Sequence, residues 1–408
     1  MKCRHCGSEL SLPLIDLGSA PPSNSYLTAE TLHAPERWYP LRVLVCQQCW
    51  LVQTEDYAHC AEFFSADYAY FSSFSSTWLQ HAENYVAAMV RRFGLYAGSL
   101  VVEVASNDGY LLQYVQARGI GALGIEPTAS TAQAARDKGL RIVEAFFGAQ
   151  LAERLVAEGV RADLMAANNV LAHVPDINDF VRGFAVLLKP AGVATFEFPH
   201  LLNLIESNQF DTIYHEHFSY LSLTAVQRIF AENGLTVFDV EELPTHGGSL
   251  RVFAQRTADG AQPVEPAVAE LLRREVQAGM AGVAFYAGFQ KRADALKNDL
   301  LSFLLDAARN GKKVAAYGAA AKGNTLLNYA GVRPDLIAYV VDRNPAKQGK
   351  WLPGSRIPIV DEQHLQRDKP DYVLILPWNL QREVVAQLDY VRDWGGRFAI
   401  AVPELTVL

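Results

Sequence analysis

The chain has 408 residues, of which 50% are hydrophobic and 20% charged, and its formal net charge is −8. The length predicts roughly two to three domains, and the composition excludes a largely disordered chain. The negative charge argues against a basic face for nucleic acid or an anionic membrane. Five cysteines, no signal-peptide pattern and no apolar stretch of about 18 residues predict a cytoplasmic protein without a membrane span.

Two Cys-x-x-Cys pairs mark the first 70 residues. Each pair places two sulfurs on one side of a tight turn, and four thiolates suit tetrahedral zinc. The pattern predicts a closed, structural zinc site, and the long interval between the pairs predicts an insert with structure of its own. His5 is expected beside the metal and not on it, and Cys60 is expected to be an unliganded thiol. The predicted zinc ligands are Cys3, Cys6, Cys46 and Cys49.

A helix is predicted over residues 76–93, because apolar side chains recur there at helical spacing. Beyond it, strand-like runs alternate with helical patterns in two regions, which indicates two doubly wound α/β sheets. A helical connector over residues 266–310 separates the two regions. The predicted strands are 99–105, 122–125, 163–167, 193–198, 230–240 and 249–256 in the first region, and 312–317, 336–341, 372–376 and 397–401 in the second.

A polar turn with one glycine, Ala-Ser-Asn-Asp-Gly (105–109), follows the first strand of the larger α/β region. Glu126 ends the next strand, at the distance typical of a ribose-binding carboxylate. The Gly-x-Gly-x-x-Gly fingerprint is missing, which disfavours a nicotinamide oxidoreductase and suits a cofactor without a diphosphate. The region resembles class I methyltransferases. That resemblance implies S-adenosylmethionine held by Glu103, Ser106, Asn107, Gly109, Glu126 and Asn168.

The segment Tyr-His-Glu-His (214–217) concentrates titratable groups in one short loop. A shared metal is disfavoured, because neighbouring side chains of an extended loop alternate in direction and the spacing is not His-Glu-x-x-His. An imidazole beside a carboxylate suits a general base. A base is needed when the methyl acceptor is a carbon next to a ketone, so the segment favours C-methylation. A loop cluster without catalytic function is the alternative.

In the second α/β region, Tyr-Gly-Ala-Ala-Ala-Lys-Gly-Asn-Thr (317–325) ends a strand and opens a helix. Helix amides together with Lys322 predict a diphosphate cradle, with Asn324 in the same turn. The order of residues is not that of a Walker A loop. Asp342 ends the next strand, as Glu126 does in the first region, so the two regions indicate an internal repeat. A helix cap in a purely structural domain is the alternative.

With these motifs in this order, the chain resembles the three-domain sugar C-methyltransferases of the tetronitrose, mycarose and noviose type. Those enzymes act on nucleotide-linked 4-keto-deoxysugars. The resemblance covers essentially the whole chain. It implies an α/β protein with an N-terminal zinc-binding module (1–70) and a class I methyltransferase Rossmann-like domain (71–260). A helical connector (261–310) and a C-terminal Rossmann-like domain (311–408) that helps to hold the nucleotide diphosphate follow.

The resemblance also implies that His217 is the general base, with Tyr214 and Glu216 lining the reacting centre. The substrate would be a dTDP- or GDP-linked 4-keto-6-deoxysugar, methylated beside the ketone at C-3 in preference to C-5. No nucleic acid or membrane partner is expected; the oligomeric state stays open, with a monomer as the working assumption. Further substrate contacts are expected from Tyr70, Ser72, His173 and Glu197.

Two other functions stay open on the sequence. The first is an O- or N-methyltransferase that acts on a nucleotide sugar, for which no enolate is needed. The second is a non-catalytic nucleotide-sugar-binding protein. Binding of S-adenosylmethionine argues against the second, and exchange of the proton next to the ketone distinguishes C-methylation from the first.

Overall fold

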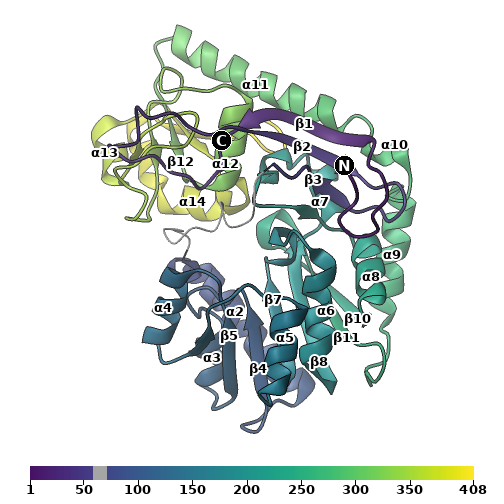
Figure 1. Cartoon of the computed structure of the whole chain (residues 1–408). Helices are drawn as coiled ribbons and strands as arrows, with labels where there is room; N and C mark the ends of the chain where they lie inside the picture. The colour runs from purple at the N-terminus through teal and green to yellow at the C-terminus, as the bar shows by residue number, and fades with distance from the viewer. Residues whose placement is uncertain (58–70) are drawn as a thin grey trace.

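The computed structural model describes residues 1–57 and 71–408, which form three β-sheets with flanking helices (Figure 1). Cys60 and Tyr70 lie outside the described residues. In Figure 1 the largest sheet occupies the lower half of the molecule, and the other two sheets lie side by side in the upper half. No helix in the described part of the chain is both long and apolar enough to cross a membrane.

The N-terminal module is built on a four-stranded antiparallel sheet of order β1-β2-β3-β9. Strands β1 and β2 lie mainly between the two cysteine pairs, so the predicted structured insert is confirmed. Strand β9 comes from far along the chain and pairs with β3 through Val52 and Tyr220. The module also shares a hydrophobic core with the connector and the C-terminal region. The strands are β1 Leu12–Ala20, β2 Tyr39–Val45, β3 Val52–Thr54 and β9 Ser219–Tyr220.

The largest sheet has seven strands in the order β10-β11-β8-β7-β4-β5-β6. The strands from β8 to β6 are parallel, and β11 and β10 continue the sheet antiparallel. The elements of this region are η1 Ser72–Phe74, α2 Ser76–Phe93, β4 Leu100–Val104, α3 Leu112–Gln116, β5 Gly121–Ile125, α4 Ala129–Asp137, β6 Arg141–Val143, α5 Ala149–Ala157, β7 Ala162–Asn168, η2 Leu171–His173, α6 Ile177–Leu187, β8 Leu188–Pro199, α7 Leu201–Glu206, η3 Phe210–Thr212, α8 Leu223–Glu232, β10 Leu235–Leu243, η4 Thr245–Gly247 and β11 Ser249–Arg256.

Helix α2 forms over the predicted residues because its ends are capped and one face is apolar. The Ser75 hydroxyl accepts a hydrogen bond from the Trp78 amide at the N-terminus. Ala82, Tyr85, Val86 and Met89, at helical spacing, are buried in one cluster.

The predicted strand at 230–240 was wrong at its start, because Phe230 belongs to helix α8 and the strand begins at Leu235. The buried residues Val226, Ile229 and Phe230 follow helical spacing, and packing of that face against the sheet decides the local structure.

The connector is helical but broken twice, and the C-terminal sheet has the order β14-β13-β12-β15-β16-β17. All its pairs are parallel except the last, and only Val340–Val341 of the predicted strand 336–341 joins the sheet. The elements are α9 Pro266–Ala278, α10 Val283–Tyr286, α11 Phe289–Arg309, β12 Val314–Tyr317, α12 Ala321–Tyr329, β13 Val340–Val341, β14 Ile359–Val360, α13 Gln363–Asp368, β15 Tyr372–Ile375, η5 Trp378–Leu380, α14 Gln381–Gln387, η6 Asp389–Trp394, β16 Arg397–Ile400 and β17 Thr406–Val407.

Candidate functional site

The four predicted zinc ligands come together in the N-terminal module. Their sulfur atoms all lie within 4.8 Å of one another, and the Cys3–Cys49 and Cys6–Cys46 Sγ pairs are each 3.5 Å apart. Sulfurs placed about 2.3 Å from a central zinc at tetrahedral angles have nearly this separation, so the residues fit the metal. His5 bonds the Asn178 side chain through Nδ1 at 2.8 Å and lies outside the sulfur cluster, as expected.

The turn after β4 has the backbone shape of a ligand-binding loop. Ala105, Asn107 and Gly109 all have left-handed backbone angles, with φ of 56°, 49° and 77°. Gly109 suits this position because its φ of 77° strains other residues and because a Cβ would lie 2.2 Å from the end of the Leu140 side chain. The turn therefore holds its amides close to the carboxyl end of the sheet, where doubly wound folds bind cofactors.

Two buried polar atoms at this edge of the sheet have no hydrogen-bond partner among residues 1–57 and 71–408: the Ser106 hydroxyl and the Asn168 side-chain oxygen. The buried Glu103 carboxylate accepts a hydrogen bond from the Tyr110 hydroxyl. Burial raises the pKa of Glu103 well above its usual range. Buried polar groups are normally paired, so these atoms fit the polar parts of S-adenosylmethionine. The Asn107 side chain accepts a hydrogen bond from the Ser72 amide at 2.9 Å, which places predicted Ser72 beside this turn.

Glu126 ties the turn to its own strand. One carboxylate oxygen accepts a hydrogen bond from the Asn107 amide at 2.9 Å, and the other accepts from the Thr128 amide at 3.0 Å. Asp342 repeats this arrangement in the C-terminal sheet. Its oxygens accept from the Ala319 amide at 2.9 Å and the Asn344 amide at 2.8 Å. The shared pattern supports the predicted internal repeat.

The Tyr-His-Glu-His loop places His217 among other rings. Its imidazole lies 4.0 Å from the Tyr214 ring and 4.6 Å from the His173 ring, measured between centroids. Nδ1 lies 3.1 Å from the Thr212 carbonyl oxygen, and because a carbonyl only accepts, Nδ1 carries the proton. Burial and the neighbouring His173 lower the pKa of His217 well below its usual value. The ring is therefore neutral near pH 7, with its Nε2 lone pair available to take a proton.

The N-terminal module holds this loop from one side. The Asn24 side-chain amide donates to a Glu216 carboxylate oxygen at 2.7 Å. The Thr54 amide and hydroxyl donate to the carbonyl oxygens of Phe218 and His217, at 3.1 and 3.2 Å. The module thus contacts the loop that carries His217, a contact that no local sequence pattern indicated.

The C-terminal domain holds the loop from the other side. The Trp378 indole donates to Asp211 at 2.8 Å, and the Thr325 hydroxyl of α12 donates to the Ile213 carbonyl at 2.8 Å. Lys322 donates to the Asn379 side chain at 2.7 Å. Asn324 is buried and donates to the Ser23 carbonyl at 2.9 Å, so its side chain joins α12 to the module instead of facing an open cradle.

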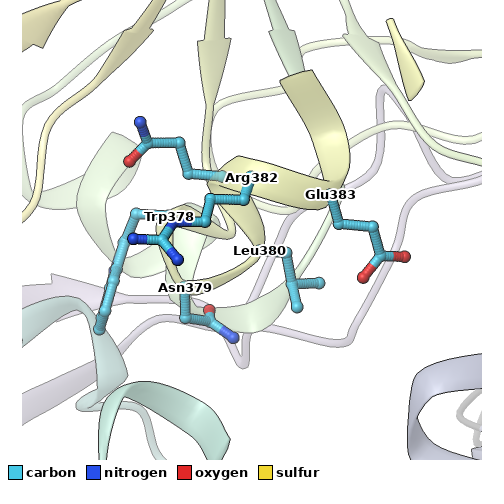
Figure 2. Close-up of a pocket in the computed structure, with 6 residues that line it drawn as sticks. Trp378, Asn379, Leu380, Arg382 and Glu383 are labelled. Carbon is cyan, nitrogen blue, oxygen red and sulfur yellow. The ribbon is translucent and has the colours of Figure 1, made fainter. Parts of the chain in front are cut away.

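A pocket of about 380 Å³ lies beside this contact, at the start of α14 (Figure 2). Trp378, Asn379 and Arg382 line it, together with Leu380, Gln381 and Glu383. Trp378 of this pocket bonds Asp211, three residues before the Tyr-His-Glu-His segment, and the pocket was not predicted from the sequence.

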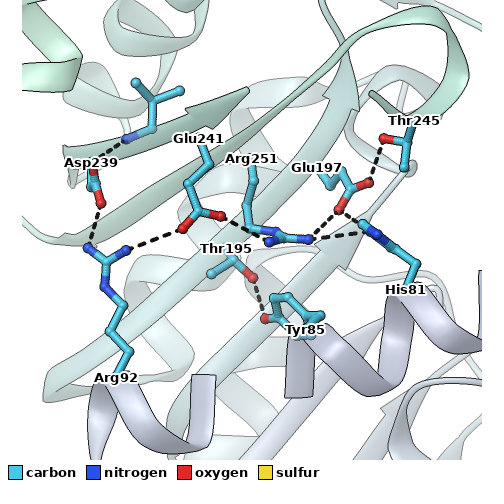
Figure 3. Close-up of polar contacts among 10 residues, drawn as sticks. His81, Tyr85, Arg92, Thr195, Glu197, Asp239, Glu241, Thr245 and Arg251 are labelled. Carbon is cyan, nitrogen blue, oxygen red and sulfur yellow. Dashed lines mark hydrogen bonds and ion pairs between the residues drawn. The ribbon is translucent and has the colours of Figure 1, made fainter. Parts of the chain in front are cut away.

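Glu197 lies in an ion-pair network at the end of β8 (Figure 3). Its carboxylate accepts from Arg251 and His81, both at 2.9 Å, and from the Thr245 hydroxyl at 3.1 Å. Burial acts to raise the pKa of Glu197, but His81 and Arg251 hold it below its usual range. With its oxygens engaged by three donors, Glu197 holds α2 and β11 together beside the site.

Arg251→Met is expected to lower the free energy of unfolding by about 3–5 kcal/mol, because it leaves the fully buried Glu197 carboxylate with one cation fewer. Urea unfolding followed by circular dichroism measures the effect. The matched control is Arg274→Met, which breaks an exposed pair with Glu242 and should cost less than about 1 kcal/mol. Equal losses for the two variants would contradict a structural function for the buried network.

Glu216 should make stability depend on pH. Burial raises its pKa from 4.5 to about 7, although the Asn24 hydrogen bond acts in the opposite direction. Between these two values the folded chain binds more protons at Glu216 than the unfolded chain does, so this group makes stability fall as the pH rises from 4.5 to about 7. Thermal unfolding of Glu216→Gln across this range should lack that contribution. Parallel pH curves for the variant and the wild type would exclude it.

The chain is similar to known proteins along its whole length. Three family models match consecutive parts of the chain: a zinc binding domain at residues 3–64, a methyltransferase domain at 78–240 and a C-methyltransferase C-terminal domain at 244–403. The chain is 36% identical over 407 residues to the C-methyltransferase NovU of Streptomyces niveus, covering 100% of this chain and 96% of that protein.

Solved structures match about half of the chain. The PH0226 protein of Pyrococcus horikoshii is 13% identical with a TM-score of 0.39, and the match covers 50% of this chain and all of that one (100%). Magnesium protoporphyrin IX methyltransferase of Synechocystis, solved with bound SAM, is 18% identical with a TM-score of 0.34, and the match covers 44% of this chain and 79% of that one.

Proposed function

The chain belongs to the C-methyltransferase family represented by NovU, and from that premise we propose that it methylates a carbon next to the ketone of a nucleotide diphospho-4-keto-6-deoxysugar. The enzyme is a C-methyltransferase that depends on S-adenosylmethionine and carries a zinc-binding module. C-3 is the proposed position, with C-5 as the alternative, and the nucleotide is of the dTDP or GDP type.

The neutral, oriented imidazole of His217 is the observation that supports this proposal. Its Nδ1–H is donated to the Thr212 carbonyl, so Nε2 can remove the proton from the carbon next to the ketone. Tyr214 and His173 pack around the ring. Bound S-adenosylmethionine supplies an electrophilic methyl group, which the enolate carbon accepts.

The two α/β domains and the module all contact the loop that carries His217, which supports a substrate site between them. We keep the segment boundaries 1–70, 71–260, 261–310 and 311–408 as part of the proposal. A cytoplasmic location is also part of it, because four cysteines that act as metal ligands suit a reducing compartment.

The test is incubation of the enzyme with S-adenosylmethionine and a panel of dTDP- and GDP-linked 4-keto-6-deoxysugars. Mass spectrometry should show a gain of one methyl group, and proton NMR should show loss of the C-3 proton signal. A methyl group on oxygen or nitrogen would identify the O- or N-methyltransferase instead. Absence of S-adenosylmethionine binding in calorimetry would favour a non-catalytic nucleotide-sugar-binding protein.

A further inference from the structure

Lys322, in the first turn of α12, carries a positive charge that no acidic side chain of the described residues neutralises directly. Its ammonium donates to the neutral Asn379 side chain at 2.7 Å and lies 4.6 Å from the centre of the Trp378 ring. Among residues 1–57 and 71–408, no carboxylate lies within ion-pair distance of it. An ammonium has three N–H donors, so this group retains capacity to bind an anion.

The position of α12 places Lys322 on the side of the helix that contacts the residues just before the Tyr-His-Glu-His segment. Thr325, three residues later on the same face of the helix, bonds the Ile213 carbonyl next to Tyr214. Trp378, which lies under the ammonium, bonds Asp211 at the start of the same loop.

The electrostatics agree with this geometry. The pKa of His246 is lowered to about 4, mainly by burial and secondly by the positive charge of Lys322. Burial, His173 and, more weakly, Lys322 lower the pKa of His217. Burial also lowers the pKa of Lys322 itself, and nearby Asp211 opposes this shift. The charge of Lys322 therefore reaches the surroundings of His217 and His246.

The proposed reaction requires a positive charge at one place. When His217 takes the proton from C-3, the C–H electron pair forms a C-3–C-4 double bond and the carbonyl π pair moves to the C-4 oxygen. When C-3 then bonds the methyl carbon, the methyl–sulfur pair leaves with sulfur and the ketone re-forms. A fixed cation beside the oxygen stabilises the enolate more than the ketone, so it accelerates the proton removal.

We propose that Lys322 is a catalytic residue that hydrogen-bonds the C-4 oxygen of the substrate and stabilises the enolate, with Asn379 and Trp378 holding its ammonium in place. This inference rests on the proposed function and sharpens the prediction that Lys322 binds substrate. In this assignment the Lys322 ammonium binds the ketone oxygen, and other groups bind the nucleotide diphosphate.

The test compares Lys322→Met and Lys322→Arg with wild type. The first measurement is uptake of deuterium at the carbon next to the ketone of dTDP-4-keto-6-deoxyglucose, or its GDP counterpart, in D₂O without methyl donor. The second is calorimetric binding of dTDP or GDP alone. The exposed Lys291→Met on α11 is the matched control, and binding of S-adenosylmethionine confirms that each variant is folded.

Lys322→Met should lower the exchange rate at saturating substrate about 10²–10³-fold, which is the usual effect of removing one oxyanion donor. Binding of the nucleoside diphosphate should change less than about twofold, and Lys322→Arg should restore part of the exchange, because it keeps a cation. Weakening of nucleoside diphosphate binding by tenfold or more with exchange retained would overturn the proposal in favour of a diphosphate contact. No exchange by the wild-type enzyme would instead overturn the proposed function, and with it the assignment of Lys322 to a ketone.

Discussion

His217→Ala is expected to lower turnover and α-proton exchange about 10³-fold, within the range typical of a lost general base. The physical reason is that Nε2 of His217 carries the lone pair that takes the proton, and the hydrogen bond from Nδ1–H to the Thr212 carbonyl orients the ring. Binding of S-adenosylmethionine should be unchanged, because the turn after β4 does not depend on this ring. Exchange is measured by proton NMR in D₂O, and turnover by mass spectrometry of the product.

The matched control for His217 is His215→Asn in the same motif. His215 bonds the Tyr39 carbonyl of the module through Nε2 at 3.1 Å, and an asparagine amide can donate a similar bond. This variant should retain turnover within about tenfold, and substitutions of Tyr214 and Glu216 should have milder effects than loss of His217. Near-full turnover by His217→Ala would show that another group removes the proton.

Removal of zinc is expected to abolish turnover while leaving the binding of S-adenosylmethionine largely intact. Zinc contributes about 10–16 kcal/mol to folding in small zinc-finger peptides, so a module without its metal should lose its structure. The module holds the His217 loop through Asn24, Thr54 and the pairing of β3 with β9. The cofactor turn belongs to the larger sheet and contacts other elements.

Cys46→Ser tests the loss of zinc without a chelator, because it removes one of the four clustered thiols. Cys46 is fully buried. The expected results are loss of bound zinc in elemental analysis, a lower Tm and turnover below about 1% of wild type. Cys60→Ser is the control and should keep one zinc per chain and full turnover. A metal-free Cys46→Ser enzyme with normal turnover would contradict any link between the module and the reacting centre.

Much of the local chemistry was predictable because it depends on short spacing. The four cysteines meet as their two Cys-x-x-Cys pairs indicated. Glu126 reaches the turn at Asn107 because both lie at the carboxyl ends of adjacent parallel strands. In contrast, the strand prediction failed at Phe230, where packing of an amphipathic helix outweighed local β-propensity.

Other parts of the candidate site depend on contacts between distant segments. Asn24 lies in a short loop with no periodic pattern, and only folding brings it to Glu216, 192 positions later. Glu197 is expected from the sequence to contact substrate, but the structure surrounds it with Arg251, His81 and Thr245. Whether it also contacts substrate stays a prediction.

The sequence by itself determined the α/β class, the four cysteines that fit zinc and the turn that suits S-adenosylmethionine, and it predicted a histidine base, because each follows from residue types at fixed local spacing. The tertiary structure decided which groups surround that base. Asn24, Trp378 and Lys322 come from two other domains, and the packing of those domains leaves no periodic signal in the chain. Burial in that shared contact also changes the pKa of Glu216 and His217, and therefore their chemistry.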